Sequence, residues 1–218
     1  MSGPATAPRI VIVDYGMGNR RSVEKALERT GARVELASDR AALAQADGLV
    51  VPGVGAFPRA MESLGRLGLD DLIVERARAG TPVLGLCLGL QLLFDSSTEL
   101  GGAPGLGLIA GEVLPLQADG LKLPHIGWSD VRWAQPSPLT QGLPEGEAFY
   151  HVHSFAPVPA RSEDLLGEAQ YGHPFASAVQ HGHLFGVQFH PEKSSTAGLR
   201  VLANFVSVCA RERRPAAA

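Results

Sequence analysis

The sequence predicts an α/β fold: a doubly wound, mainly parallel sheet with helices on both faces, followed by an antiparallel C-terminal section. Two observations predict the parallel part. Apolar, β-branched runs such as residues 9–14 and 48–51 are typical of strands buried on both faces, and helical patterns alternate with them. A third observation predicts the antiparallel part, because from about Gly101 the chain becomes a series of strand-like segments punctuated by Gly and Pro.

The first half of the chain provides the elements of the parallel part. Asn19 is a residue type that caps helix N-termini and Gly31 is one that ends helices, so a helix is expected between them. Gly65 and Gly68 interrupt a later helical pattern. The expected elements are a strand at 9–14, a helix at 19–30, a strand at 33–37, a short helix at 39–46, a strand at 48–51, helical residues 57–79, a strand ending at Cys87, and a helix after it that buries Leu90, Leu92, Leu93 and Phe94.

The second half provides antiparallel strands and a closing helix. The strands are expected at 106–116, 125–133, 148–157 and 176–189, the last with a hairpin around residues 180–183. Residues 196–211 carry apolar side chains at helical spacing, which places Cys209 in the core. Residues 9–211 are therefore expected to form one domain, between a disordered segment at 1–8 and a flexible tail at 212–218.

Composition and charge argue against several classes of function. Nineteen Lys and Arg stand against 22 Asp and Glu, a net charge of −3, and no basic run of the kind that binds nucleic acid is present. The two cysteines, Cys87 and Cys209, cannot make a disulfide framework and fit a reducing compartment. Because no secretory signal and no membrane-length apolar run are apparent, we expect a cytoplasmic protein without membrane contacts.

The segment Gly85-Leu86-Cys87-Leu88-Gly89 has the form of a nucleophile elbow, with Cys where many hydrolases carry Ser. Such an elbow turns a strand sharply into a helix, and the flanking glycines remove side chains that would collide. The helix that follows directs its N-terminus at the sulfur, which favours a thiolate. We therefore predict that Cys87 is a nucleophile, in preference to a buried core cysteine.

Two backbone segments are candidates for an oxyanion hole. Elbow hydrolases take one N–H donor from the residue after the nucleophile, here Leu88, and another from the loop after the third strand. That loop begins with Pro52 and contains Gly53, Val54 and Gly55. An ordinary Pro-Gly turn is the alternative, but the position of this loop after the third strand favours an oxyanion hole.

A candidate base and its orienting group lie near the end of the chain. His190 and Glu192 are two residues apart, so in an extended segment their side chains share a face and Glu192 can hold the His190 ring. The other ring nitrogen is then available to Cys87. Although an isolated pair of this kind is usually a surface feature, the upstream elbow favours a Cys87–His190–Glu192 triad.

Two other motifs are disfavoured as binding sites. Gly16 and Gly18 follow the first strand and Asp39 follows at the distance of a ribose-binding acid, but Arg21 occupies the place of the third glycine of a dinucleotide site. His151 and His153 share one strand face, but no third ligand at a recognisable spacing accompanies them. We therefore expect neither a cofactor nor a metal.

The motifs together resemble those of a class I, or triad, glutamine amidotransferase. The resemblance is carried by Gly85-Leu-Cys-Leu-Gly-Leu-Gln91, by Pro52-Gly-Val-Gly55 and by Gln188-Phe-His-Pro-Glu-Lys193, in a match that covers residues 9–210. The segments 14–19, 124–128, 151–155 and 188–194 are similar to those of the glutaminase subunits of imidazole glycerol phosphate synthases, in histidine biosynthesis. Arg20 and Ser129 depart from that pattern, where Leu and Asn are usual.

This resemblance implies hydrolysis of L-glutamine to glutamate and ammonia through a thioester on Cys87. It also implies that Gln91, Glu99 and the Ser154–Phe155 backbone hold the substrate, with Glu99 suited to its ammonium group. Gln91 lies one helical turn after Cys87, on the face that looks into the same crevice.

The resemblance further implies a heterodimer with a (β/α)8-barrel cyclase, which receives the ammonia through its core and makes imidazole glycerol phosphate and AICAR. The isolated glutaminase is then expected to be nearly idle, and rotation of a peptide in the 53–55 loop could switch it on when the cyclase binds its ligand. Four residues that flank the catalytic motifs are candidates for the interface or the ammonia path, with Lys193 expected to pair with an acidic group: Pro124, Trp128, Tyr150 and Lys193.

Three rival functions are compatible with parts of the sequence. The glutaminase subunit of pyridoxal 5′-phosphate synthase is the nearest, although the segment 124–128 argues against it. A thiol peptidase or esterase could use the same elbow and triad, but it would need an open cleft and would leave Gln91 and Glu99 without a role. A catalytically inactive binding module is disfavoured by the complete triad.

Overall fold

The computed structural model of the protein describes residues 7–212 of the chain. The expected disordered segment at 1–8 and flexible tail at 212–218 lie outside this range, apart from residues 7, 8 and 212. Glu212 is the last residue of helix α6 (Ser195–Glu212), so the closing helix extends one residue beyond its predicted end. Within the described range, no helix is both long and apolar enough to cross a lipid bilayer.

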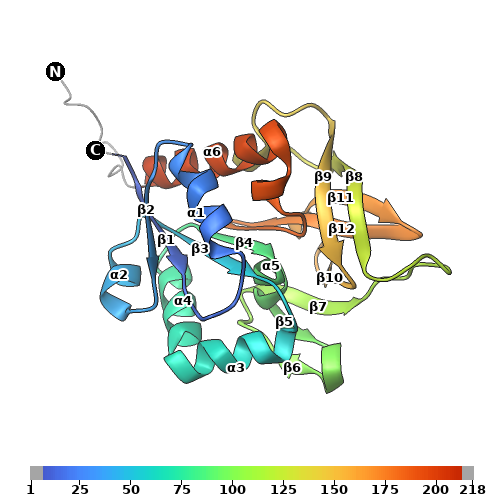
Figure 1. Cartoon of the computed structure of the whole chain (residues 1–218), viewed down its shortest axis with the longest axis horizontal. Helices are drawn as coiled ribbons and strands as arrows, with labels where there is room; N and C mark the ends of the chain where they lie inside the picture. The colour runs from blue at the N-terminus through green and yellow to red at the C-terminus, as the bar shows by residue number, and fades with distance from the viewer. Residues whose placement is uncertain (1–6, 213–218) are drawn as a thin grey trace.

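A nine-stranded sheet forms the centre of the protein (Figure 1). Its first five strands are parallel to one another and the other four are antiparallel, which confirms the predicted fold class. In spatial order the strands are β2 (Arg33–Ala37), β1 (Arg9–Val13), β3 (Gly48–Gly53), β4 (Val83–Cys87), β13 (Leu184–Val187), β12 (His173–His181), β11 (Leu165–Tyr171), β8 (His125–Trp133) and β9 (Gly146–His153).

Helices cover both faces of the parallel strands (Figure 1). Along β1, Val11 and Val13 pack into one core while Ile10 and Ile12 pack into the other, because successive strand residues point to opposite faces. The helices α1 (Arg20–Glu28) and α6 contribute to the core that contains Ile10 and Ile12. The opposite core is covered by α2 (Arg40–Ala44), α3 (Phe57–Leu67), α4 (Leu69–Arg78) and α5 (Leu88–Leu92).

The structure contains a second, four-stranded sheet that we did not predict, in the order β10 (Phe155–Pro159), β7 (Ile109–Pro115), β5 (Phe94–Ser97) and β6 (Ala103–Pro104). The predicted helix through Phe94 is wrong, because α5 ends at Leu92 and Phe94 begins β5. The helix ends because its last backbone carbonyls have other partners. The carbonyls of Leu92 and Leu93 accept hydrogen bonds from the backbone N–H groups of residues 106, 108 and 109, and not from residues further along a helix.

Two further strand predictions require correction. The single strand expected at 148–157 is divided at Ser154, with β9 in the large sheet and β10 in the small one. Strand β11 was missed, because Gly167 and several polar residues weaken its strand pattern. Gly167 is required there, since a Cβ at that position would lie 2.8 Å from the Trp133 ring.

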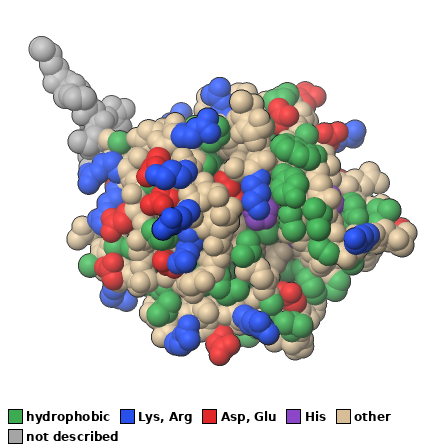
Figure 2. All heavy atoms as spheres, in the orientation of Figure 1, with side chains coloured by type: hydrophobic (Ala, Val, Ile, Leu, Met, Phe, Trp, Pro, Cys, Tyr) green, Lys and Arg blue, Asp and Glu red, His purple; other side chains and the backbone are tan. Residues whose placement is uncertain are grey.

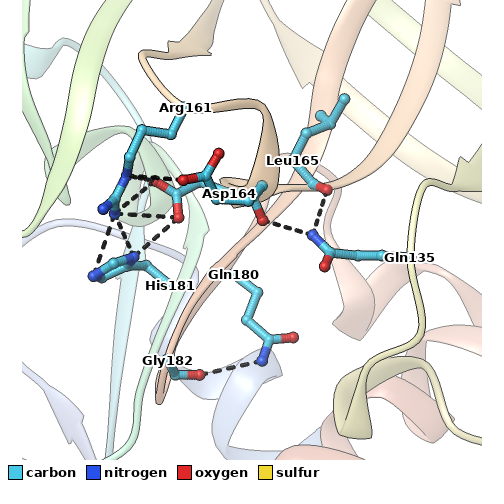
Figure 3. A network of polar contacts seen from close by, with 8 residues as sticks. Gln135, Arg161, Asp164, Leu165, Gln180, His181 and Gly182 are labelled. Carbon is cyan, nitrogen blue, oxygen red and sulfur yellow. Dashed lines mark hydrogen bonds and ion pairs between the residues drawn. The ribbon is translucent and has the colours of Figure 1, made fainter.

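Short turns and polar contacts connect these elements. One-turn 3-10 helices lie at Glu99–Gly101, Pro138–Thr140, Ser162–Asp164 and Pro191–Lys193. The buried Asp164 carboxylate accepts hydrogen bonds from Arg161 and His181, and Gln135 Nε2 donates to the carbonyls of Glu163 and Leu165 (Figure 3). This network ties the loop before β11 to the β12–β13 hairpin, which was predicted around residues 180–183.

Candidate active site

Cys87 lies at a sharp turn between β4 and α5. Its φ is 53° and its ψ is −110°, an unusual conformation for a residue with a side chain and one that costs about 1–3 kcal/mol. The chain bends so tightly that a Cβ at Gly89 would lie 1.8 Å from Val51 O, and one at Gly85 would lie 2.5 Å from Gly89 O. The two glycines therefore permit the elbow for the steric reason that the sequence suggests.

Gly89→Ala is expected to lower the free energy of unfolding by about 3 kcal/mol or more, because the new methyl group overlaps the backbone of β3. Urea denaturation followed by circular dichroism measures this loss. Gly65→Ala, in α3, is the matched control, since a Cβ there meets only Asp70 Oδ2, at 3.3 Å. Equal stability of the two variants would contradict the steric role of Gly89.

His190 and Glu192 lie beside the elbow because β13 is the parallel neighbour of β4. Leu86 pairs with Val187, so both strands deliver the residues that follow them to the same edge of the sheet. His190 Nδ1 donates a hydrogen bond of 3.0 Å to Glu192 Oε1, and both side chains are almost completely buried.

The protonation of His190 is tuned by these neighbours. Burial alone lowers the pKa of His190, but hydrogen bonds to Cys87 and Glu192 and the charges of both outweigh it, raising the pKa to about 9. The ring therefore contacts the sulfur on one side and the carboxylate on the other. This is the arrangement of a nucleophile, a base and an orienting group.

A cavity of about 270 Å³ opens in front of Cys87. Most of the residues predicted for the site line it, while Gly53 and Glu192 lie behind it, around a smaller void. The lining residues are Val54, Gly55, Cys87, Leu88, Gln91, Glu99, Pro124, Val152, His153, Ser154, Phe155, His190 and Lys193. A cavity of this size suits a small metabolite and not an extended polymer.

The candidate oxyanion loop starts beside the elbow. Gly53 pairs with Cys87 in the register of β3 and β4, whereas Val54 and Gly55 are exposed toward the cavity. The Tyr15 hydroxyl, which sequence reasoning missed, donates a hydrogen bond of 2.6 Å to Pro52 O and fixes the start of this loop. A side chain at Gly53 would collide with that hydroxyl at 2.7 Å.

The residues predicted to hold a substrate lie on the other walls of the cavity. Gln91 is buried, and its Nε2 donates to Phe155 O at 2.9 Å. Glu99 Oε2 accepts a hydrogen bond of 2.8 Å from Phe57 N, which leaves its second carboxylate oxygen for other partners. Ser154 and Phe155 lie where the chain passes from the large sheet to the small one.

The four predicted partner residues divide into two groups. Pro124 and Lys193 line the cavity itself, whereas Trp128 and Tyr150 are a cross-strand pair of β8 and β9 whose rings are 6.0 Å apart. Lys193 Nζ lies 6.0 Å from the centre of the Tyr150 ring, so the two groups are adjacent. Hydrophobic side chains gather on one side of the molecule (Figure 2). The large exposed hydrophobic side chains of the chain include Ile126 and Trp128 of β8, and Leu121 and Leu123 just before that strand.

The two disfavoured motifs have structural uses. Asp39 caps α2 by accepting a hydrogen bond from Ala42 N. His151 is fully buried and contacts Phe149 O and Ser177 Oγ, and its ring stacks against that of His125. Within residues 7–212, no group of three or more His, Cys, Asp or Glu side chains is arranged to hold a metal ion.

The two departures from the family pattern also have local partners. The Arg20 guanidinium pairs with the Asp14 carboxylate at the start of α1. Ser129 Oγ lies 3.1 Å from His125 Nε2 on β8. Asn19 occupies the position before α1, as predicted, but its side chain makes no capping hydrogen bond there.

The protein should lose stability below pH 6.5 because of two buried imidazoles. Burial lowers the pKa of His151 to about 2 and that of His153 to about 3, whereas an unfolded histidine has a pKa of about 6.5. The unfolded chain therefore binds more protons between these values, so their stabilising contribution is complete above pH 6.5 and is lost as the pH falls. Each can remove up to about 1.4 kcal/mol per pH unit from the unfolding free energy.

His151→Gln should flatten this pH dependence, measured as the urea unfolding free energy from pH 7 to pH 4.5. His183→Gln is the control, because His183 is only partly buried and contacts a single carbonyl, Ala77 O. A slope identical in wild type and His151→Gln would show that His151 does not cause it.

Comparisons with known proteins match most of the chain to one family. The family model described as glutamine amidotransferase class-I matches residues 11–209. The HisH subunit of imidazole glycerol phosphate synthase from Moorella thermoacetica is 53% identical over 196 residues, covering 90% of this chain and 93% of that protein. The HisH subunit of Wolinella succinogenes is 45% identical over 201 residues, covering 90% and 98%.

Solved structures share the fold at lower sequence identity. A putative GMP synthase component from Thermoplasma acidophilum superposes with a TM-score of 0.73 at 20% identity, covering 95% of this chain and 96% of that one. PurLQS from Thermotoga maritima gives a TM-score of 0.72 at 20% identity, covering 93% and 99%. At this identity the likeness concerns the fold alone.

Proposed function

The chain belongs to the class-I glutamine amidotransferases, whose family model matches residues 11–209, and from this premise we propose that it is the glutaminase subunit of an imidazole glycerol phosphate synthase. It hydrolyses L-glutamine to glutamate and ammonia within that enzyme. Curated HisH relatives at 45–53% identity over about nine-tenths of the chain support this function. The observation that carries it is a cysteine in an elbow, touching a His–Glu pair, inside a small cavity.

Cys87 and His190 perform the chemistry. The Cys87 thiolate attacks the carboxamide carbon of glutamine, and its proton resides on His190. His190, held by Glu192, then protonates the amide nitrogen as the carbon–nitrogen bond breaks, so that ammonia leaves and a glutamyl thioester remains. A water molecule, deprotonated by His190, attacks the thioester and releases glutamate and the thiol.

The backbone stabilises the charge that develops on the substrate oxygen. Leu88 N–H and one N–H of the Gly53-Val54-Gly55 loop donate to the tetrahedral oxyanion, each contributing about 3–4 kcal/mol. Gln91, Glu99 and the Ser154–Phe155 backbone hold the amino-acid end of glutamine, with the Glu99 carboxylate facing its ammonium. These residues line the same cavity as the sulfur, which supports the assignment.

The curated relatives are named as subunits of a synthase, so a further polypeptide of that synthase is implied as partner. Our finer proposal is that the partner is a (β/α)8-barrel cyclase that accepts the ammonia directly. Ammonia released into water would be protonated and lost as a nucleophile, so a dry path is needed. Pro124, Trp128, Tyr150 and Lys193 are proposed to face this partner, because they surround the mouth of the cavity or lie beside it.

Release of glutamate from glutamine, with and without the cyclase, tests the function. We expect low activity for the isolated chain and a large increase in the complex when the cyclase ligand is present, because the 53–55 loop supplies its donor only then. Full activity of the isolated chain would contradict this switching. A response to the pyridoxal 5′-phosphate synthase partner in place of the cyclase, or hydrolysis of peptides or esters, would favour a rival function.

Lys193→Ala is expected to weaken cyclase binding about fivefold at low salt, and to reduce the salt dependence of binding, because an exposed ion pair across the interface is lost. Isothermal titration at two salt concentrations measures both effects. Lys25→Ala, on α1, is the control, since Lys25 pairs locally with Glu28. Unchanged affinity and salt dependence for Lys193→Ala would remove Lys193 from the interface.

A further inference from the structure

Gln188 is a completely buried polar side chain beside the proposed nucleophile Cys87, and it has no part in the proposed reaction. It follows β13 by one residue and has no exposed surface. Its Nε2 lies 3.7 Å from Cys87 Sγ, and its Oε1 lies 3.1 Å from Gln91 Nε2. Gln188 thus connects the Cys87 sulfur to Gln91, one of the residues proposed to hold the substrate.

The direction of these hydrogen bonds is fixed by a backbone carbonyl. Phe155 O can only accept, so the Gln91 atom 2.9 Å from it must be the amide nitrogen. The same nitrogen faces Gln188, which must therefore present its oxygen to Gln91. The Gln188 nitrogen is then directed at Cys87 as a donor. No other orientation of the two amides satisfies all three contacts.

The sulfur has contacts of opposite character. Val152 O, 3.8 Å away, accepts a hydrogen bond from the thiol and so favours the protonated sulfur. The Gln188 N–H donates to the sulfur and so favours the thiolate. The titratable groups that also face it are His190 from the end of β13, backed by Glu192, and Tyr15 from the loop after β1.

We propose that Gln188 is a catalytic residue that donates a hydrogen bond to the Cys87 thiolate and holds Gln91 in the orientation that meets the substrate. The inference rests on the proposed function for the role of Cys87 and deepens it. A charged acceptor makes such a bond stronger than one between neutral groups, so its loss favours the thiol over the thiolate. A series of hydrogen bonds also links Phe155 O, through Gln91 and Gln188, to the Cys87 sulfur.

The rate of Cys87 alkylation by iodoacetamide, measured against pH on the full chain, tests this proposal without any glutamine turnover. Gln188→Met keeps the length of the side chain and removes the donor. For this variant we expect the pH at which the alkylation rate is half-maximal to be about one unit higher than in wild type. We expect its alkylation rate at pH 7 to be about tenfold lower. Gln180→Met is the matched control, because Gln180 lies on β12 and its side chain bonds to Gly182 O, away from the sulfur.

Gln188→Glu is a second test in case Gln188→Met does not fold. Glu is nearly isosteric with Gln, and it places a carboxyl group beside the Cys87 sulfur. It should shift the alkylation profile upward at least as far as Gln188→Met. Profiles that coincide with wild type in a variant that keeps its circular dichroism spectrum would overturn the role of Gln188. If the variants shift the alkylation profile but the wild-type chain does not hydrolyse glutamine in the presence of the cyclase, the hydrogen bond from Gln188 to Cys87 is supported and the proposed function is refuted.

Discussion

Cys87→Ala is expected to lower the rate of glutamine hydrolysis in the proposed complex with the cyclase by at least about 10⁴-fold, because no other thiol of the described residues reaches the cavity. Removal of a nucleophile eliminates the covalent path, and only the slow attack of water on a bound amide remains. Glutamate release in the complex measures the loss. The fold should survive, since Ala fits the space of Cys and circular dichroism can verify it.

Two controls separate this loss from a general effect. Cys209→Ala removes the other buried thiol, in α6, and should leave glutamine hydrolysis within about twofold of wild type. In the Cys87→Ala complex, ammonium salts added at high pH should restore cyclase product, because the acceptor reaction needs only free ammonia. Persistent glutamine-dependent activity in Cys87→Ala would disprove the nucleophile assignment.

His190→Asn should reduce glutamine hydrolysis about 10³-fold or more, because the variant loses both the base and the acid that the reaction needs. In the proposed mechanism, the protonated His190 ring is the form that donates to the departing nitrogen. Since the pKa of His190 is raised to about 9, activity should fall as the pH rises through about 9. Initial rates of glutamate release between pH 6 and pH 10 measure this decline.

Glu192→Gln tests the cause of the raised pKa. The hydrogen bond and the charge of Glu192 are two of the contributions that raise the pKa of His190, so their loss should move the alkaline decline toward lower pH. Glu163→Gln, at an exposed carboxylate remote from the cavity, should leave the decline where it is. An alkaline decline that stays near pH 9 in Glu192→Gln would show that another contact tunes His190.

The parallel part of the fold could be predicted in detail because its signals are local. Buried strands such as β1 and β3 are continuous apolar runs, and the glycines around Cys87 have a steric meaning that sequence spacing already suggests. The proximity of Cys87 and His190 was predicted from their motifs alone, because residues 176–189 were expected among the antiparallel strands, whereas β13 pairs in parallel with β4.

Features that depend on pairing between distant segments could not be predicted. Whether Leu92 and Leu93 continue a helix or accept bonds from residues 106–109 is decided by tertiary packing, and the pattern of apolar residues is the same in both cases. Gln188 was equally hidden, because an amide next to a strand end shows its partners only once β4 and β13 are neighbours. The one sequence signal that could have pointed to it is a polar glutamine between the apolar Val187 and Phe189, two residues before His190.

The adjacency of β4 and β13 has a consequence for biogenesis. A ribosome releases the elbow that carries Cys87 long before it releases His190, so a growing polypeptide holds Cys87 without its imidazole partner until β13 docks beside β4. The pair of side chains on which the proposed mechanism depends is therefore assembled only after one of the last elements of the chain has joined the sheet.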